Sequence, residues 1–314
     1  MRSLCRAASA GKPRKKAFHP HSSVVHCSYR TKPERKLPMK TYSREKRLIP
    51  TPWGQMKIII LRPAAQQAAA PGVLWIHGGG YATGMAGMVY MSRAMALVKK
   101  YGAVVVAPEY RLAGRHPYPD GLEDCCTALL YMKEHASELN IDPARLMVGG
   151  ESAGGGLTAA LCMACRDHGN VNIAFQMPLY PMLDDRDTPS SRNCRGISWN
   201  TRRNHAAWKL YLTRVTGAPS PYAAPARQTD YTCLPPCYTF VGNKEPFYCE
   251  TLTYIENLQK AGVPASVDVY PSGFHAFDML LPWRKISRRA AAAFEQAFQY
   301  AVQHYTAPQK DQAH

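Results

Sequence analysis

The sequence lacks any long apolar run, and it is poor in acidic residues. No stretch approaches the ~18 uninterrupted apolar residues of a transmembrane helix, so we expect no membrane-spanning segment. The start of the chain also lacks the apolar core of a secretory signal peptide. Only 22 Asp and Glu stand against 39 Lys and Arg, which gives a formal net charge of +17. Such an excess is typical of proteins that bind nucleic acids or membrane surfaces, so its distribution decides what it means.

About half of this charge lies in residues 1–38. The segment holds ten Lys and Arg but a single acid, Glu34, so it carries +9 of the +17. It has four prolines and neither helical nor strand periodicity, and we interpret it as a disordered basic tail before a domain over 39–314. A targeting leader, a nucleic-acid arm and an upstream extension before a natural start at Met39 are the alternatives. For the domain itself we expect neither a nucleic acid nor a membrane as partner.

Ten cysteines in a chain of this length, without a signal peptide, do not indicate a disulfide framework. Cys162 and Cys165 form a C-x-x-C pair, and Cys233 and Cys237 a C-x-x-x-C pair, a spacing in which zinc is conceivable. The first pair lies in a predicted helix among apolar residues, where cysteine behaves as a small buried hydrophobe. We therefore expect reduced cysteines, no metal or other cofactor, and a cytoplasmic protein.

From about residue 45 the chain alternates predicted strands and helices. Strands are predicted at 46–50 and 56–61, which form a hairpin, and at 73–76, 103–107, 146–148, 173–179, 237–241 and 266–270. Helices are predicted at 88–100, 120–139, 154–168, 247–261 and 283–304. Apolar strands alternating with helices indicate an α/β fold whose mostly parallel sheet has helices on both faces. The polar, Arg-rich stretch 184–216 interrupts the alternation and is predicted to form a small cap; an ordinary crossover helix at 201–215 is the alternative.

Residues 150–154 read G-E-S-A-G and match G-x-S-x-G, which alone is modest evidence. A predicted strand runs into the motif and a predicted helix leaves it, which is the setting of a nucleophile elbow. Glycines are needed there because the turn is sharp and a side chain would collide with the neighbouring strand or helix. We predict Ser152 as the nucleophile; a glycine-rich turn with an idle serine is the alternative.

Residues 77–80 read H-G-G-G and follow another predicted strand. Successive glycines let the backbone approach a substrate, and their N–H groups can stabilise the oxyanion of ester hydrolysis by ~3–4 kcal/mol per donor. A phosphate-binding loop is not supported, because neither G-x-G-x-x-G nor a following Gly-Lys-Ser/Thr is present. We expect an oxyanion loop in which His77 anchors the backbone rather than serving as the base.

A serine nucleophile needs a base, and the base needs an orienting acid. In folds with a nucleophile elbow, the acid and then the histidine follow the serine along the chain. His275 lies in the loop after the strand predicted at 266–270 and is the candidate base. His205 precedes the candidate acid, and His304 lies in the last predicted helix.

Glu245 is the candidate acid, because it follows directly on the strand predicted at 237–241. Glu250 would lie within the next helix, and Asp268 lies in a different strand. The alternative for Glu245 is a structural role at a helix start, where carboxylates favour the helix dipole.

Six blocks recur in a familiar order: residues 77–80 (H-G-G-G), 110–113 (Y-R-L-A), 122–124 (L-E-D), 150–155 (G-E-S-A-G-G), 242–246 (G-N-K-E-P) and 273–275 (G-F-H). Together they resemble the hormone-sensitive-lipase-like branch of the α/β-hydrolases, which includes bacterial carboxylesterases and acetyl esterases. The resemblance covers roughly residues 45–305. It implies the triad Ser152, Glu245 and His275, with the backbone N–H groups of Gly79, Gly80 and Ala153 as oxyanion donors. Glu245 departs from the usual Asp of the family, and residues 1–45 do not read as its N-terminal cap helices.

The resemblance implies a serine esterase for short to medium acyl chains, with a small-molecule ester as partner and no cofactor. An aryl-formamidase or another amidase could use the same constellation, because amide and ester hydrolysis share a tetrahedral intermediate. Some members of this fold are non-catalytic receptors, but those typically have a broken triad, and competent residues fill all three positions here. A homodimer is also compatible with the sequence.

Overall fold

A computed structural model of the chain describes residues 41–65 and 69–309. The basic tail predicted at 1–38 lies outside the described residues. The described residues all belong to one compact unit, Lys40–His314.

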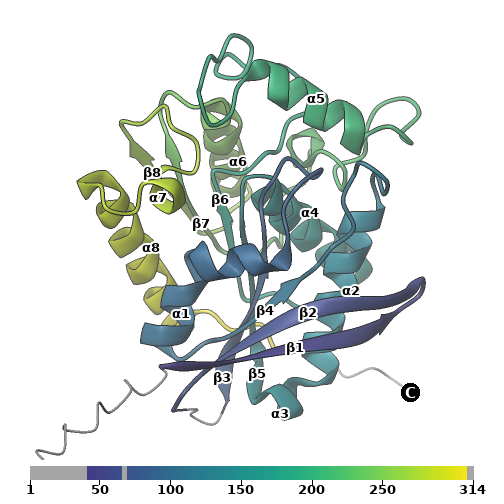
Figure 1. Cartoon of the computed structure of the whole chain (residues 1–314), viewed down its shortest axis with the longest axis vertical. Coiled ribbons are helices and arrows are strands. Elements are labelled where there is room, and N and C mark those ends of the chain that lie inside the picture. The colour runs from purple at the N-terminus through teal and green to yellow at the C-terminus, as the bar shows by residue number, and fades with distance from the viewer. Residues whose placement is uncertain (1–40, 66–68, 310–314) are drawn as a thin grey trace, which may run out of the picture. The chain divides into compact units, whose positions relative to one another are not determined.

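Within the described residues, eight strands form one sheet in the order β1-β2-β4-β3-β5-β6-β7-β8 (Figure 1). They are β1 (Tyr42–Thr51), β2 (Gly54–Pro63), β3 (Ala70–Ile76), β4 (Val104–Pro108), β5 (Ile141–Glu151), β6 (Phe175–Leu179), β7 (Cys237–Gly242) and β8 (Ala265–Tyr270). The β1–β2 and β2–β4 pairs are antiparallel, and the other five pairs are parallel. The predicted fold class, with its antiparallel hairpin at the edge, is confirmed.

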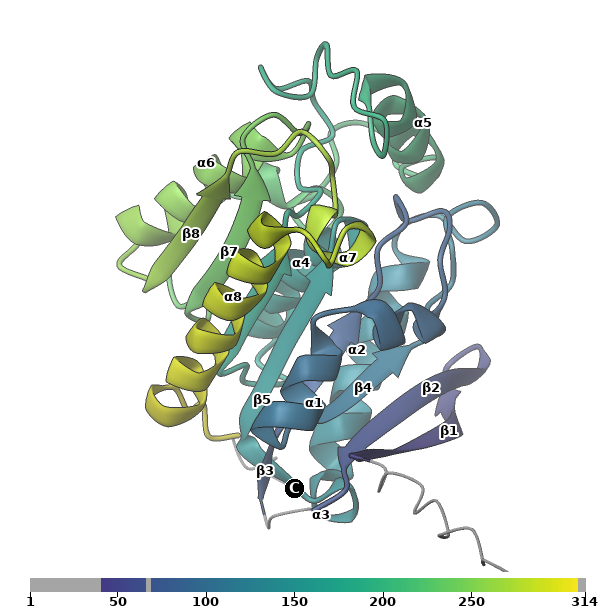
Figure 2. The ribbon, with the colours of Figure 1, turned by 60° about the vertical axis from the view of Figure 1, so that its left-hand side comes forward.

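Helices cover both faces of this sheet (Figure 2). They are η1 (Ala86–Met91), α1 (Ala94–Tyr101), α2 (Asp120–Glu134), α3 (Ala136–Leu139), α4 (Ala153–His168), α5 (Thr201–Tyr211), η2 (Pro225–Arg227), α6 (Tyr248–Lys260), α7 (Phe277–Leu280) and α8 (Lys285–His304). One hydrophobic cluster lies between the sheet and α2, α4 and α6, and a second lies on the face covered by α1 and α8. Because β3, β4, β6 and β7 are buried at every position, their sequences are mainly apolar instead of alternating, with Gln176 and Thr239 as buried polar exceptions.

Two of the predicted helices are interrupted. The helix predicted at 88–100 divides at Ser92, whose Oγ donates to the carbonyl of Val89 at 2.9 Å and accepts the N–H of Ala94 at 3.1 Å. These side-chain bonds replace helical backbone bonds, and Met91, just before the break, is 63% exposed. The helix predicted at 120–139 divides at His135, whose imidazole Nδ1 bonds the carbonyl of Tyr131 at 3.0 Å.

The segment predicted as a cap follows β6 and leads to β7. Its helix is α5, which lies above the upper edge of the sheet, at the top of Figure 1. Asn200 caps the helix by accepting the N–H of Arg203 at 3.0 Å. Arg214, just after α5, bonds Asp120 of α2 at 2.8 Å and fastens the segment to the rest of the domain.

Candidate active site

Ser152 occupies the sharp turn between β5 and α4. Its backbone has φ +57 and ψ −118, a conformation that costs energy for any residue other than glycine. The Ser152 N–H donates to the carbonyl of Leu179 on β6 at 3.0 Å, which helps to hold the turn. The strained turn places the Ser152 hydroxyl at the carboxyl end of the sheet, as a nucleophile elbow does.

The glycines around Ser152 are required by close packing. A Cβ atom added to Gly150 or to Gly154 would collide with the backbone carbonyl oxygen of Ile76 on the neighbouring strand. Backbone atoms cannot move aside as a flexible side chain can, so β3 and the elbow can approach this closely only with glycine at both positions. The collision with a neighbouring strand that the sequence predicts for any side chain at these positions is therefore present in the structure.

His275 and Glu245 lie next to Ser152. The His275 Nε2 is 2.8 Å from the Ser152 Oγ, and its Nδ1 hydrogen-bonds Glu245 Oε2. The other carboxylate oxygen of Glu245, Oε1, accepts the N–H of Gly242 at 3.2 Å. The three residues are 7%, 5% and 1% exposed, from serine to acid. The structure thus brings the three predicted residues into one buried, hydrogen-bonded line, as a nucleophile, a base and an orienting acid require.

The loop that carries His275 is fastened from behind by a buried acid. The Asp278 Oδ1 accepts the Tyr180 hydroxyl at 2.9 Å, and Asp278 Oδ2 lies 3.1 Å from Arg93 Nε. Tyr180 in turn places its ring 5.1 Å from the imidazole of His275, nearly perpendicular to it. Although Arg93 and Tyr180 act in the opposite direction, burial raises the pKa of Asp278 above its usual range. Tyr180 and Asp278 therefore restrict the orientation of His275.

The H-G-G-G segment passes beside the nucleophile. A Cβ atom on Gly78 would lie 3.3 Å from the Cβ of Ser152. Gly79 and Gly80 have φ values of +122 and +59, which favour glycine. The carbonyl of Gly79 accepts both the backbone N–H of Thr83, at 3.0 Å, and its hydroxyl, at 2.9 Å. Thr83 thereby fixes the loop, so its backbone is preorganised next to Ser152.

Ala153, the third predicted oxyanion donor, is the first residue of α4 and is fully buried. Its N–H belongs to the helix N-terminus, where backbone donors and the helix dipole favour negative charge. His77, in contrast, has no bond to the triad. Its Nδ1 lies 2.7 Å from the carbonyl of Gly78, its ring stacks on Tyr110 at 4.2 Å, and burial lowers its pKa. This placement fits the predicted anchoring role.

The alternative bases and acids lie elsewhere. His205 is exposed and pairs with Asp187 at 2.7 Å, and His304 is exposed on α8. Asp268 accepts the Tyr238 hydroxyl on the outer strands.

Glu250 is buried on α6 and serves the cap rather than His275. Its Oε1 accepts the N–H groups of Leu183 and Asp184, at 2.6 and 3.3 Å, where the chain leaves β6 for the cap. Burial raises the pKa of Glu250 well above its usual range. The nearby carboxylates of Asp184 and Glu245 act in the same direction as burial, while the two backbone N–H groups oppose them.

Glu151, beside the nucleophile, points away from it and into the core. Its Oε1 accepts the indole N–H of Trp75 at 2.9 Å, and burial raises its pKa to about 8. Between pH ~4.5 and 8 the unfolded chain releases this proton while the folded protein keeps it, so rising pH costs stability. Replacing Glu151 with Gln keeps an acceptor for Trp75 and removes the titration. The stability of the variant relative to wild type should therefore rise by up to about 1.4 kcal/mol per pH unit.

Denaturant unfolding at pH 5, 6.5 and 8 measures this difference. The matched control is Glu256→Gln, because Glu256 is exposed on α6 and should track wild type at all three pH values. A constant gap between Glu151→Gln and wild type across the range would show that Glu151 is ionised in the folded protein.

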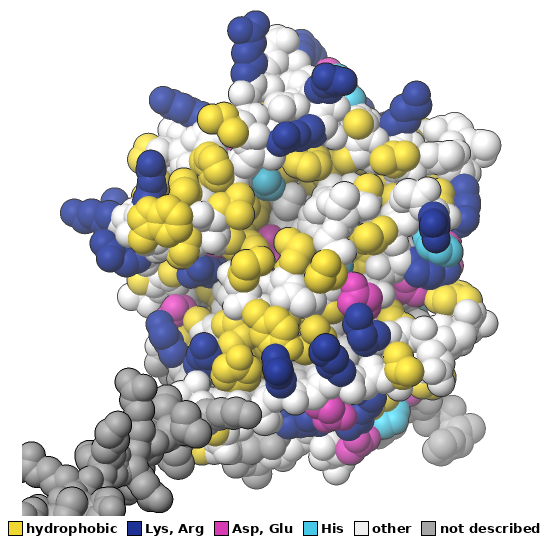
Figure 3. Space-filling view, viewed as in Figure 1, with side chains coloured by type: hydrophobic (Ala, Val, Ile, Leu, Met, Phe, Trp, Pro, Cys, Tyr) yellow, Lys and Arg dark blue, Asp and Glu magenta, His cyan; other side chains and the backbone are white. Residues whose placement is uncertain are grey.

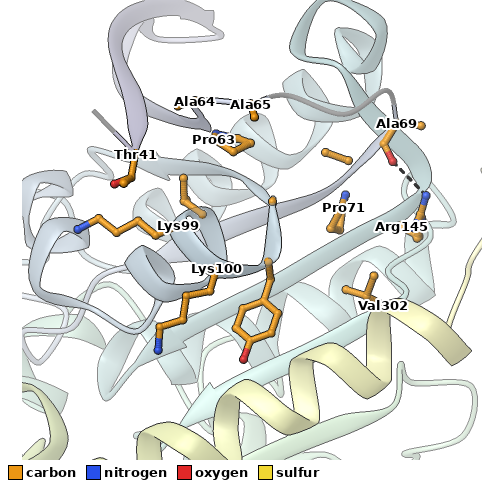
Figure 4. A pocket seen from close by; sticks show the side chains of 14 residues that line it. Thr41, Pro63, Ala64, Ala65, Ala69, Pro71, Lys99, Lys100, Arg145 and Val302 are labelled. Carbon is orange, nitrogen blue, oxygen red and sulfur yellow. Dashed lines mark hydrogen bonds between the residues drawn. The ribbon is translucent and has the colours of Figure 1, made fainter. Parts of the chain in front are cut away.

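The surface is hollowed below the cap helix α5, and a second pocket lies at the other end of the sheet. Figure 3 shows hydrophobic side chains gathered around a hollow below the cap helix α5. The second pocket, of about 590 Å³, lies at the amino end of β3 (Figure 4). Its cations are already engaged: Lys100 pairs with Glu295, Arg145 bonds Asp142 and the carbonyl of Ala69, and Lys99 lies over the Tyr42 ring. It holds none of the predicted site residues.

Three further features concern the described part of the chain. Its eight cysteines are free, and burial raises the pKa of Cys162 and Cys165 on α4 well above the usual range, as expected for unreactive core thiols. Across 41–65 and 69–309 no group of three or more His, Cys, Asp or Glu is placed to hold a metal ion. Among the same residues no helix has the length and apolar character needed to cross a membrane.

Comparison with known proteins agrees with this geometry. Residues 73–279 match the model of a family described as the alpha/beta hydrolase fold. The chain belongs to this family, and the resemblance to its hormone-sensitive-lipase-like branch, predicted from the six motifs, is confirmed.

Several similar proteins carry esterase names. The chain is 34% identical to esterase LipI of Mycobacterium tuberculosis over 64% of its own length and 63% of that protein. It is 32% identical to carboxylesterase NlhH of the same organism over 66% of each chain. The matched segments thus span just under two thirds of these relatives. A solved structure of a bacterial heroin esterase superposes with a TM-score of 0.79 at 35% identity, covering 85% of this chain and 86% of that one.

Sequence reasoning missed several side chains around His275. Tyr180, Phe247 and Trp199 place their rings 5.1, 4.9 and 6.3 Å from its imidazole, and Asp278 fastens its loop. Tyr180 directly follows β6, so the general rule that sites form at the carboxyl ends of parallel strands could have found it. Trp199 had no such signal, because its position depends on how the cap folds back over the sheet.

Proposed function

We propose that the chain is a serine carboxylic ester hydrolase that acts on esters with short to medium acyl groups. The observation that carries this proposal is the buried line from Ser152 Oγ through His275 to Glu245. The esterase names of its relatives and structural neighbours support the same reaction class.

In this proposal Ser152 attacks the ester carbonyl while His275 takes the serine proton at Nε2. Glu245 keeps the other ring nitrogen protonated and stabilises the imidazolium that forms. The backbone N–H groups of Gly79, Gly80 and Ala153 bind the oxyanion of the tetrahedral intermediate. His275 then gives its proton to the leaving alcohol, and water hydrolyses the acyl-enzyme by the reverse route.

A series of p-nitrophenyl esters from acetate to dodecanoate, assayed beside an aryl formamide, tests this function. We expect kcat/KM to be highest for acetate to butyrate, because Ser152 is only 7% exposed, which leaves little room beside the nucleophile for a long acyl chain. A fluorophosphonate probe should label Ser152 with one equivalent. Exclusive turnover of the formamide would instead identify an amidase, and no labelling would identify a non-catalytic member of the fold.

A further inference from the structure

Trp199 lies on the cap just before α5, close to His275. The proposed mechanism assigns it no step in breaking or forming a bond. Its indole centre lies 6.3 Å from the imidazole of His275. A Cβ atom on Gly80 would lie 2.5 Å from Cη2 of the indole, so the ring edge touches the oxyanion loop. The side chain is also partly exposed. The indole therefore borders both the base and the oxyanion loop and remains partly accessible.

The indole is held in place from three sides. Its Nε1–H donates to the Oδ1 of Asn204, a buried residue of α5, at 3.3 Å. The ring of Phe247, fully buried, lies 6.4 Å away and supports it from the α6 side. Ala207 of α5 also closes on Gly80, so the cap helix and the oxyanion loop are in contact beside the indole. Because the indole is already held in place, its side chain loses little conformational entropy when a ligand binds. A wall fixed in this way can distinguish ligands by how well they pack against it.

The chemistry of the reaction says which part of the ester meets this wall. The leaving alcohol oxygen must come within hydrogen-bond reach of His275 Nε2, since that nitrogen donates the proton. The alcohol group therefore extends on the imidazole side, where Trp199 and Phe247 lie. Aromatic rings pack on one another more favourably than aliphatic groups of the same size, by about two- to tenfold in an equilibrium or rate.

We propose that Trp199 is a specificity-determining residue whose indole walls the subsite for the alcohol part of the ester and selects aromatic alcohols. This inference rests on the proposed esterase function and adds the class of its leaving group. The indole packs against the alcohol group of the bound ester. It therefore changes how well an ester is positioned and leaves the order of the chemical steps unaltered.

The test compares benzyl acetate with cyclohexylmethyl acetate, which differ in aromaticity but share the acyl group and a primary alcohol. For wild type we expect kcat/KM to favour the benzyl ester about five- to tenfold. In Trp199→Leu the ratio should fall to about one, and Trp199→Phe should keep at least half of the wild-type preference. Trp53→Leu is the matched control, because Trp53 is an exposed indole on the β1–β2 turn and should leave the ratio unchanged.

A second ester pair decides between the two sides of the carbonyl. Ethyl phenylacetate and ethyl cyclohexylacetate carry the same difference on the acyl group, and their ratio should not respond to Trp199→Leu. A response of this pair in place of the benzyl pair would overturn the inference and place the indole on the acyl side. An unchanged benzyl ratio in both Trp199 variants would also overturn it while leaving the esterase function standing. Failure of wild type to hydrolyse any of the four esters would refute the proposed function and this inference together.

Discussion

Replacing Ser152 with Ala is expected to lower kcat/KM for p-nitrophenyl acetate by about five to six orders of magnitude. The Oγ of Ser152 is the atom that would form the acyl-enzyme, and the hydroxyl lies 2.8 Å from the base that activates it. Without this hydroxyl, His275 and Glu245 have no nucleophile to activate. The loss of rate should therefore equal the loss expected from removing all three residues together. A residual rate above water would remain from the oxyanion loop and substrate binding.

The fold should survive this substitution. Alanine keeps the Cβ atom of Ser152, and its backbone can adopt the same φ of +57 at a similar cost. The thermal midpoint should therefore stay within a few degrees of wild type while fluorophosphonate labelling disappears. Ser266→Ala, at an exposed position on β8, is the control and should keep full turnover and labelling. Full turnover by Ser152→Ala would mean that another group attacks the ester.

The three candidate site residues could be picked out from sequence because each follows a parallel strand. Ser152, Glu245 and His275 follow β5, β7 and β8, and the continuous apolar runs of such strands are visible along the chain. The carboxyl ends of parallel strands meet at one edge of the sheet, so residues separated by 123 positions come within hydrogen-bond distance. The chain order then left few candidates for each role.

The details that sequence reasoning missed depend on contacts between distant segments. The break before α1 arises because the Ser92 hydroxyl donates to the Val89 carbonyl. The spacing of apolar residues along the chain does not reveal this bond. Asp278 follows His275 by three residues, but its partners Tyr180 and Arg93 lie just after β6 and just before α1. Trp199 was predicted only as part of the cap, since no spacing rule says which cap residue turns inward.

These missed residues and the predicted triad play different parts at one site. In the proposed reaction the triad supplies the groups that move protons and form bonds, and its members follow the chain order of serine, acid and histidine. Asp278 and Tyr180 instead fix the angle of the imidazole from behind, and Trp199 covers it from the cap. Such supporting contacts decide how precisely a base meets its nucleophile, and the loss of that precision lowers the rate without removing any reacting group.

Replacing Glu245 with Gln is expected to lower kcat by about four orders of magnitude near neutral pH. In wild type Oε1 of Glu245 accepts the Gly242 N–H, which leaves Oε2 to accept a proton from His275 Nδ1. In the variant the same Gly242 N–H should hold the amide oxygen, so the amide NH₂ faces Nδ1 and donates to it. The imidazole is then protonated at Nε2, the nitrogen that must take the serine proton, and cannot act as a base.

Glu245→Asp separates this effect from a change of shape. Aspartate keeps the negative charge but is one methylene shorter, so it should lengthen the bond to Nδ1 while still favouring the right tautomer. We expect it to lose about ten- to a hundredfold in kcat, and so to stay about a hundredfold or more above Glu245→Gln. Kinetics on one ester and the thermal midpoint of each variant measure this difference. A Glu245→Gln enzyme within tenfold of wild type would reduce Glu245 to a structural carboxylate at the start of α6. Equal losses in both variants would show that the length of the side chain, rather than its charge, sets the position of His275.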